Sequence, residues 1–219
     1  VLYDKNGLHY RRYWSLESHE HTDSLETTAE TIRSLVIDAI ERQLVADVPV
    51  CTFLSGGLDS SAITAVAANN FMKNGPGTLH TYSIDYTDND KYFKVNDFQP
   101  NSDAPWVAYM SDMFKTNHHY ITVDTSQLSQ ALTDAVRARD LPGMADIDSS
   151  LWFFCREIKK NATVALSGEC ADEVFGGYPW FHREEMLNAD TFPWSRFIDE
   201  RTRVLSPEIL EYISPEAYV

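Results

Sequence analysis

Residues 55–61 read Ser-Gly-Gly-Leu-Asp-Ser-Ser and stand between a short apolar run at 50–54 and an alanine-rich stretch at 60–70. A short apolar run is typical of a buried strand, and the alanine-rich stretch is typical of a helix. Two glycines remove side chains where the backbone turns tightly, and the following helix directs its positive end at the same place. The stretch therefore predicts a strand, a turn that binds an anion, and a helix.

The side chains of this turn favour a phosphate as the anion. Ser55, Ser60 and Ser61 add hydroxyl donors. Asp59 adds a carboxylate, which would repel a phosphate unless a divalent cation lay between them. The turn has neither the Gly-Lys-Ser/Thr ending of a Walker A loop nor the GxGxxG pattern. The alternative is that the glycines serve only the turn, but the three hydroxyls and the carboxylate favour phosphate binding.

On either side of this turn, short apolar strands alternate with amphipathic helices. We expect further strands at 79–84, 119–123 and 163–166, and helices at 27–47, from 102 onward, at 125–139 and at 149–160. Residues 9–14 form at most one short strand, and residues 85–101 are a polar loop with a solvated acidic cluster at Asp85, Asp88 and Asp90. The alternation predicts an α/β fold, an open parallel sheet with helices on both faces.

A second loop, rich in carboxylates, follows the fourth expected strand. Residues 167–173 read Ser-Gly-Glu-Cys-Ala-Asp-Glu, and they could be a solvated acidic turn. In open parallel sheets, however, ligands bind at the carboxyl ends of the strands, where the strand order reverses. If the first and fourth strands are neighbours, Asp59 and Asp172 can share one Mg²⁺.

The two loops together resemble a known family. SGGLDSS at 55–61 resembles the pyrophosphate-binding loop of the ATP-pyrophosphatase, or PP-loop, superfamily. SGECADEVFGGY at 167–178 resembles the second signature of the synthetase domain of glutamine-hydrolysing asparagine synthetases, and the resemblance extends from residue 8 to about 185. It implies an adenine nucleotide alpha hydrolase-like fold with strand order 3-2-1-4-5, a linker at 1–23, the synthetase domain at 24–185, and the start of a truncated C-terminal helical region at 186–219.

The resemblance also implies the cofactors and the residues of the site. ATP and Mg²⁺ are the cofactors, with Asp59 and Asp172 binding Mg²⁺. Glu169 would face the acyl-adenylate and act as the base for incoming ammonia. The residues implied to hold the pyrophosphate of ATP or to line its adenosine pocket are Leu54, Ser55, Gly56, Gly57, Asp59, Ser60, Ser61, Ile84, Ser167 and Gly168.

The activity implied by the resemblance is that of an ATP-dependent, AMP-forming amide synthetase, a ligase of asparagine biosynthesis. The side-chain carboxylate of aspartate would be activated as β-aspartyl-AMP, and ammonia, made from glutamine by a glutaminase domain absent here, would then give asparagine. One alternative is a nucleotide-binding or interaction module without full catalytic activity. Another is a β-lactam synthetase-like relative, although those relatives carry a tyrosine where this chain has Glu169.

The chain departs from the family pattern in three respects, one of which is the missing N-terminal glutaminase domain with its cysteine nucleophile. Family members commonly carry a glycine where this chain has Cys170, so either the loop bends differently or a thiol faces the site. The chain also begins at Val1 and stops at Val219, before the region that supplies a lysine to the pyrophosphate in the family. We therefore expect a fragment that turns over poorly or not at all by itself.

The composition limits the partners and the location. There are 18 Lys and Arg residues against 33 Asp and Glu residues, and the formal net charge of −15 repels a polyanion, so nucleic acid is not expected as a partner. No apolar stretch approaches the roughly 18 residues of a membrane span, and no signal peptide is evident. Three widely spaced cysteines fit a reducing compartment. We expect a soluble, cytoplasmic protein without membrane contact. The sequence does not decide whether it forms a homodimer.

Chain direction predicts where the amino-acid substrate binds. Only Asn161 and Ala162 lie between the helix expected to end near Lys160 and the fourth strand, so that helix must end at the amino edge of the sheet. Its start, at Asp148 and Ser149, then lies at the carboxyl edge, where helix N–H groups could receive the carboxylate of the substrate. The alternative is that Asp148 only caps the helix.

Overall fold

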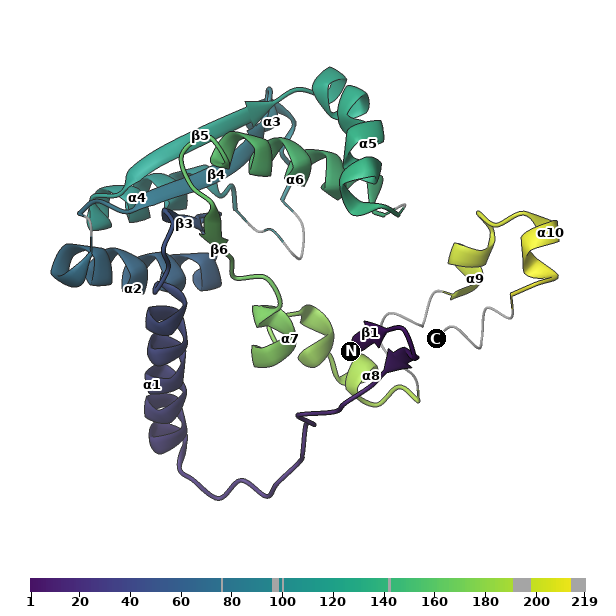
Figure 1. Ribbon diagram of the computed structural model, residues 1–219, viewed down its shortest axis with the longest axis horizontal. Coiled ribbons are helices and arrows are strands. Elements are labelled where there is room, and N and C mark those ends of the chain that lie inside the picture. The colour runs from purple at the N-terminus through teal and green to yellow at the C-terminus, as the bar shows by residue number, and fades with distance from the viewer. Residues whose placement is uncertain (76, 96–98, 100, 142, 191–197, 214–219) are drawn as a thin grey trace. The chain divides into compact units, whose positions relative to one another are not determined.

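The computed structural model describes residues 1–75, 77–95, 99, 101–141, 143–190 and 198–213 (Figure 1). The chain divides into two compact units, Val1–Ala39 and Ile40–Val219. α1 (Leu25–Gln43) contains the boundary between them.

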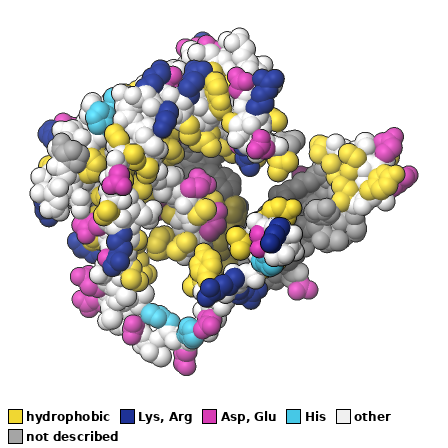
Figure 2. All heavy atoms as spheres, in the orientation of Figure 1, with side chains coloured by type: hydrophobic (Ala, Val, Ile, Leu, Met, Phe, Trp, Pro, Cys, Tyr) yellow, Lys and Arg dark blue, Asp and Glu magenta, His cyan; other side chains and the backbone are white. Residues whose placement is uncertain are grey.

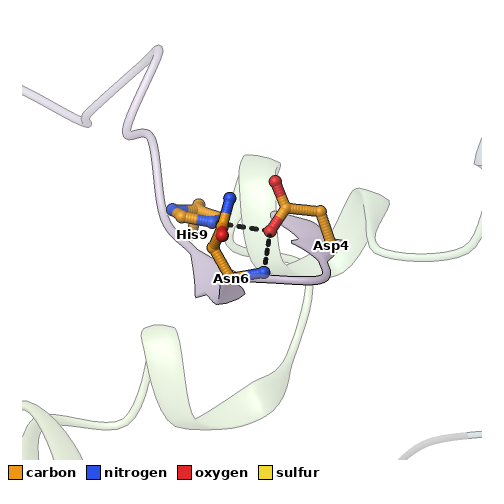
Figure 3. Close-up of polar contacts among 3 residues, drawn as sticks. All are labelled: Asp4, Asn6 and His9. Atoms are coloured by element: carbon orange, nitrogen blue, oxygen red, sulfur yellow. Dashed lines mark hydrogen bonds and ion pairs between the residues drawn. The ribbon is translucent and has the colours of Figure 1, made fainter.

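The first unit opens with a β-hairpin, in which β1 (Leu2–Asp4) pairs antiparallel with β2 (Gly7–His9). In its turn, Oδ1 of Asp4 accepts a hydrogen bond of 2.7 Å from the backbone N–H of Asn6 and lies 3.1 Å from Nε2 of His9 (Figure 3). Gly7 has φ +113°, which favours glycine. At most a short strand was expected at residues 9–14, and strand pairing ends at His9, so residues 10–14 form no strand; the hairpin itself was not predicted.

A helix was predicted at 27–47. α1 starts two residues earlier than predicted, at Leu25, and also ends four residues earlier, at Gln43. Ser24, and not Thr27, caps this helix, since Oγ of Ser24 accepts a hydrogen bond of 3.2 Å from the backbone N–H of Thr27. The helix start predicted at Thr27 is therefore wrong, because the capping residue lies three positions earlier.

The second unit contains the predicted parallel sheet. Its strands are β3 (Val50–Phe53), β4 (His80–Tyr86), β5 (Asn117–Val123) and β6 (Val164–Leu166), and all neighbours are parallel. The order β5-β4-β3-β6 is 3-2-1-4 when these strands are counted along the chain. This agrees with the first four places of the expected order 3-2-1-4-5, and the fifth strand is not found within the described residues. β3 and β6 are therefore neighbours, as the shared-site hypothesis requires.

Helices pack on both faces of this sheet (Figure 1). α2 (Leu58–Asn74) and α4 (Ala104–Phe114) pack on one face, where the buried hydroxyls of Thr52 and Thr64 are hydrogen-bonded at 3.0 Å. α5 (Thr125–Arg139) and α6 (Ala145–Ile158) pack together on the other face, where the rings of Phe53 and Phe154 lie 4.7 Å apart. The predicted open α/β architecture is confirmed.

One part of the core lies between the sheet and α5 and α6, and α2 and α4 also bury apolar side chains, including Ala67, Phe71 and Val107. One cluster joins Cys51 and Tyr82 of the sheet to Phe154 and Ile158 of α6, and a second joins Val123 to helix residues of α5 and α6. Burial raises the pKa of the Cys51 thiol to about 12, so this cysteine is protonated and has a packing role.

The remaining elements are short: α3 (Asn89–Tyr92), α7 (Ala171–Phe175), a 3-10 helix η1 (Pro179–Phe181), α8 (Glu184–Leu187), α9 (Ile198–Thr202) and α10 (Pro207–Leu210). In the part of the chain that the structure describes, no helix combines the length and the apolar character needed to cross a membrane. Acidic and basic side chains are mixed over the face seen in Figure 2, with hydrophobic side chains between them.

His118 and His119 lie at the start of β5 and are partly buried, in agreement with the surface or strand-end positions that the sequence pattern favours for them. Nδ1 of His118 lies 2.8 Å from the hydroxyl of Thr81, and Nε2 lies 3.0 Å from the hydroxyl of Ser83. Burial and the neighbouring His119 lower the pKa of His118 from 6.5 to about 4. His118 is therefore neutral at physiological pH.

This burial makes the stability of the fold depend on pH. The unfolded chain takes up a proton on His118 below pH 6.5 and the folded chain does so only near pH 4, so stability is full above pH 6.5 and falls between these values. We expect a loss of about 2 kcal/mol over this range, after allowance for partial exposure. Urea unfolding at a series of pH values, with His118→Gln as the comparison, measures it. Equal pH dependence in both proteins would contradict the assignment to His118.

Candidate nucleotide cleft

The first loop leaves β3 through a turn that only glycine fits. Leu54 is fully buried, and its backbone N–H donates a hydrogen bond of 2.8 Å to the carbonyl of Tyr82. Gly56 has φ +89°, and a Cβ at this position would lie 2.9 Å from the carbonyl oxygen of Asp103 and 3.0 Å from Cβ of Trp106. Both the conformation and the close contact with α4 require glycine.

Serine hydroxyls hold this loop in shape. The hydroxyls of Ser55 and Ser60 lie 2.9 Å apart, and the backbone N–H of Ser55 donates to Oγ of Ser60 at 3.2 Å. Gly57 is the residue before α2, and no side chain caps the helix there. The N–H groups of the first turn of α2 lie beside the loop, and the start of a helix is a place that binds anions.

The second loop lies directly against the first. A Cβ on Gly168 would lie 2.9 Å from Cβ of Asp59 and 3.2 Å from the backbone nitrogen of Ser60. The backbone N–H of Glu169 donates a hydrogen bond of 3.2 Å to Oγ of Ser167. The two loops predicted to lie side by side are therefore in contact, and Gly168 makes the contact sterically allowed.

Together with the end of β4 and the start of α4, the loops line a cleft of about 500 Å³, called the carboxyl-edge cleft here because its loops follow the carboxyl ends of β3, β4 and β6. Gly56 and Ser61, also expected at the site, are not among its lining residues. The residues predicted from sequence that line it are Leu54, Ser55, Gly57, Asp59, Ser60, Ile84, Ser167, Gly168, Glu169 and Asp172.

The charge of Asp172 affects the carboxyl group of Asp59 in the cleft. Burial raises the pKa of Asp59, and the negative charge of Asp172 raises it further. Within the described residues, no group of three or more His, Cys, Asp or Glu side chains is placed to hold a metal ion. Two carboxylates do suit Mg²⁺, which usually takes one or two protein carboxylates and completes its coordination with water and substrate phosphates.

The backbone conformation of Cys170 shows how the loop bends where family members commonly carry glycine. It has φ 69° and ψ 6°, the left-handed conformation that glycine favours, so the loop bends as it would with glycine. The exposed residue also lines the cleft.

Substitutions of Cys170 should follow this backbone conformation. We expect Cys170→Val to lower the free energy of unfolding by about 1 kcal/mol, because a β-branched residue is disfavoured in the left-handed region, and Cys170→Gly not to lower it. Urea denaturation of both variants, with Cys170→Ala as the control for the thiol, measures this. If the valine variant were as stable as the glycine variant, the conformation would be contradicted.

The expected substrate residues Asp148 and Ser149 do not line the cleft. α6 begins at Ala145, not at 149, so the predicted helix start is wrong by four residues. The carboxylate of Asp148 pairs with Nη1 of Arg139 at 2.7 Å and does not cap the helix. The edge was predicted correctly, since the hydroxyl of Ser150 lies 2.9 Å from that of Tyr86, the last residue of β4.

Residues that the sequence reading missed form another wall of the cleft. Asp85, expected in a solvated cluster, lines the cleft and accepts a hydrogen bond of 2.7 Å from Nδ2 of Asn89. Asp103 also lines it, and burial raises the pKa of this carboxyl group. Asp85 follows the buried part of β4, and that position at the end of a strand was the signal available in the sequence.

Tyr178 is a further lining residue that was not singled out, although it ends the second motif. Its hydroxyl donates a hydrogen bond of 3.1 Å to Oε1 of Glu173, and its ring stacks on that of Trp180 with 4.2 Å between centroids. These contacts fix the side chain of Tyr178 at the border of the cleft.

A parallel sheet whose carboxyl edge carries a glycine-rich anion turn beside a loop of carboxylates is typical of α/β proteins that bind nucleotides. The family model described as asparagine synthase matches residues 31–218, and the chain belongs to this family.

Curated relatives agree with this family. An asparagine synthetase [glutamine-hydrolyzing] 3 of Bacillus subtilis (strain 168) is 55% identical over 219 residues, which are 100% of this chain and 35% of the relative. A putative asparagine synthetase [glutamine-hydrolyzing] 2 of Methanocaldococcus jannaschii is 31% identical over 80% of this chain and 31% of the relative. An amidase chyE of Penicillium rubens is 30% identical over 83% of this chain and 28% of the relative.

The chain thus spans about a third of the length of these relatives. Among solved structures, an NAD+ synthetase from Burkholderia pseudomallei is similar over 87% of this chain and 89% of that one, with 15% identity and a TM-score of 0.36. That likeness is too low to bear on the fold or on the site.

Proposed function

We propose that the carboxyl-edge cleft binds ATP with Mg²⁺ and belongs to an AMP-forming amide synthetase, which activates the side-chain carboxylate of aspartate and transfers ammonia to it. The observation that carries the proposal is the contact of Gly168 with Asp59, which brings the glycine-rich turn and the loop of Glu169 and Asp172 into one cleft. Membership of the asparagine synthase family supports the same chemistry.

The glycine-rich turn has the properties needed to bind the pyrophosphate part of ATP. The N–H groups at the start of α2 and the positive end of that helix suit a highly charged leaving group. Asp59 and Asp172 would hold Mg²⁺, which supplies positive charge to the phosphates when it is bound. Ser55 and Ser60 keep the turn in position through their shared hydrogen bond.

Glu169 has the chemistry needed in the second half of the reaction. Attack of ammonia on an activated acyl carbon puts positive charge on nitrogen, and a carboxylate at the cleft can take a proton from it. Glu169 lines the cleft with its side chain exposed, so it can reach a bound substrate. The alternative, a nucleotide-binding module without full activity, predicts ATP binding without amide formation.

The compartment is part of the same proposal. The three cysteines Cys51, Cys155 and Cys170 are all free thiols, which supports a reducing compartment such as the cytoplasm.

Titration calorimetry of this chain with ATP tests the nucleotide part of the proposal. We expect binding in the presence of Mg²⁺ and much weaker binding when Mg²⁺ is chelated, because two carboxylates and the phosphates repel one another without a cation. Absence of ATP binding by the folded chain in excess Mg²⁺ would contradict the proposal. Amide formation is to be assayed in a full-length form, meaning this chain together with the regions that the longer relatives carry outside the matched part.

A further inference from the structure

The chain folds back over Asp172 directly after α7. The backbone N–H groups of Gly176 and Gly177 both donate hydrogen bonds to the carbonyl of Asp172, the second at 3.0 Å. Gly176 has φ +68° and ends the helix, as glycine commonly does. This turn places Gly177 beside the side chain of Asp172.

Gly177 leaves the space that the Asp172 carboxylate fills. A Cβ built on Gly177 would overlap Oδ1 of Asp172 and lie 2.9 Å from its Cγ. Gly177 is not among the glycines with positive φ, so its backbone conformation is open to any residue. The reason for glycine at this position is therefore the carboxylate and not the backbone.

The second motif thus places one glycine against each of the two aspartate residues. Gly168 meets Asp59 at Cβ and also approaches the backbone of Ser60, so a larger residue there must displace main-chain atoms. The three atoms nearest a Cβ at Gly177 all belong to Asp172, with the carboxylate oxygen closest. A methyl group at 177 can therefore be accommodated by rotation of the Asp172 side chain, at a small cost in stability.

We propose that Gly177 is a positioning residue, which fixes the direction of the Asp172 carboxylate in the cleft and thereby sets the Mg²⁺ dependence of ATP binding. This inference rests on the proposed function, in which Asp172 is a ligand of Mg²⁺. Mg²⁺ demands near-ideal octahedral geometry, so a carboxylate turned away from its place is lost as a ligand even though the fold survives.

The test compares Gly177→Ala with the unmodified chain by measuring ATP affinity at a series of Mg²⁺ concentrations. We expect the Mg²⁺ concentration for half-maximal ATP binding to rise about tenfold, the size of effect typical for groups that orient metal ligands. Thermal unfolding should change little. A Gly177→Ala protein that did not fold would overturn the inference, because the backbone and not the carboxylate would then need the glycine.

Gly75→Ala is the matched control. A Cβ on Gly75, at the end of α2, would lie 2.9 Å from Cα of Phe71. This substitution therefore crowds backbone atoms of residues that do not line the cleft. We expect it to lower the unfolding temperature and to leave the Mg²⁺ dependence unchanged. An equal shift of the Mg²⁺ dependence in Gly75→Ala would show a general effect of weakened folding and overturn the positioning role.

Asp172→Asn separates failure of this inference from failure of the proposed function. We expect Asp172→Asn to raise the required Mg²⁺, and Gly177→Ala to add nothing further once Asp172 has been replaced. An unchanged Mg²⁺ dependence in Asp172→Asn would contradict the metal site itself. A shift in Asp172→Asn without one in Gly177→Ala, or additive shifts in the double variant, would overturn only the role of Gly177.

Discussion

Replacing Glu169 by Gln is expected to lower the rate of amide formation by about 10²- to 10⁴-fold, the usual contribution of a general base, while ATP binding stays nearly unchanged. The glutamine side chain keeps the size and polarity of glutamate but cannot take the proton that leaves the attacking ammonia. Glu169 is exposed at the cleft and donates its backbone N–H to Oγ of Ser167, a contact that does not involve its carboxylate, so the fold should tolerate the change. Asparagine formation by the full-length form and ATP binding by calorimetry are the two measurements.

Glu173→Gln is the matched control for this substitution. Glu173 belongs to the same loop, but it does not line the cleft and accepts a hydrogen bond from Tyr178. We expect it to retain most of the activity. Equal losses in the Glu169 and Glu173 variants would contradict the assignment of Glu169 as the base.

Replacing Asp59 by Asn is expected to weaken ATP binding by at least about tenfold in the presence of Mg²⁺, because one of the two proposed protein ligands is lost. Without Mg²⁺ the expected effect of Asp59→Asn on ATP affinity is the opposite. The raised pKa of Asp59 reflects burial and the charge of Asp172, and a phosphate would meet the same unfavourable charge, so removing the carboxylate should improve binding of metal-free ATP. Calorimetry with Mg²⁺ and with a chelator measures both effects.

Asp88→Asn serves as the control for Asp59→Asn. Asp88 is an exposed carboxylate before α3 and does not line the cleft. It has φ 60°, a conformation that asparagine also tolerates. We expect unchanged ATP binding with and without Mg²⁺ in this variant. If Asp59→Asn also left the Mg²⁺ dependence unchanged, the shared metal site would be wrong.

Much of the fold follows from local patterns in the sequence. Apolar runs at β3, β4 and β6 and the apolar helix faces predict the α/β fold class. The glycines of the first loop indicate the turn into α2. The start of α6 was missed for a physical reason. Met144 precedes this helix and no side chain caps it, so the sequence carries no capping signal there.

Some residues of the site could be predicted from local motifs, and others reach it only through tertiary packing. Asp59, Glu169 and Asp172 lie in short motifs directly after strands, where position along the chain indicates the edge of the sheet. Asp103 and Tyr178 reach the cleft only through tertiary packing, Asp103 through the contact of α4 with Gly56 and Tyr178 through the turn after α7. No local pattern predicts such contacts. Asp148 was assigned to the site from its place at a helix start, but its carboxylate is taken by Arg139.

ATP–pyrophosphate exchange by the full-length form, with and without aspartate, tests the central claim most directly. If the carboxyl-edge cleft activates a carboxylate by transfer of AMP, labelled pyrophosphate will enter ATP when aspartate and Mg²⁺ are both present. The exchange will be lost in Asp172→Asn and retained in Glu169→Gln, because Glu169 acts only after the adenylate has formed. Exchange that needs no aspartate, or no exchange from an enzyme that makes asparagine, would contradict the account.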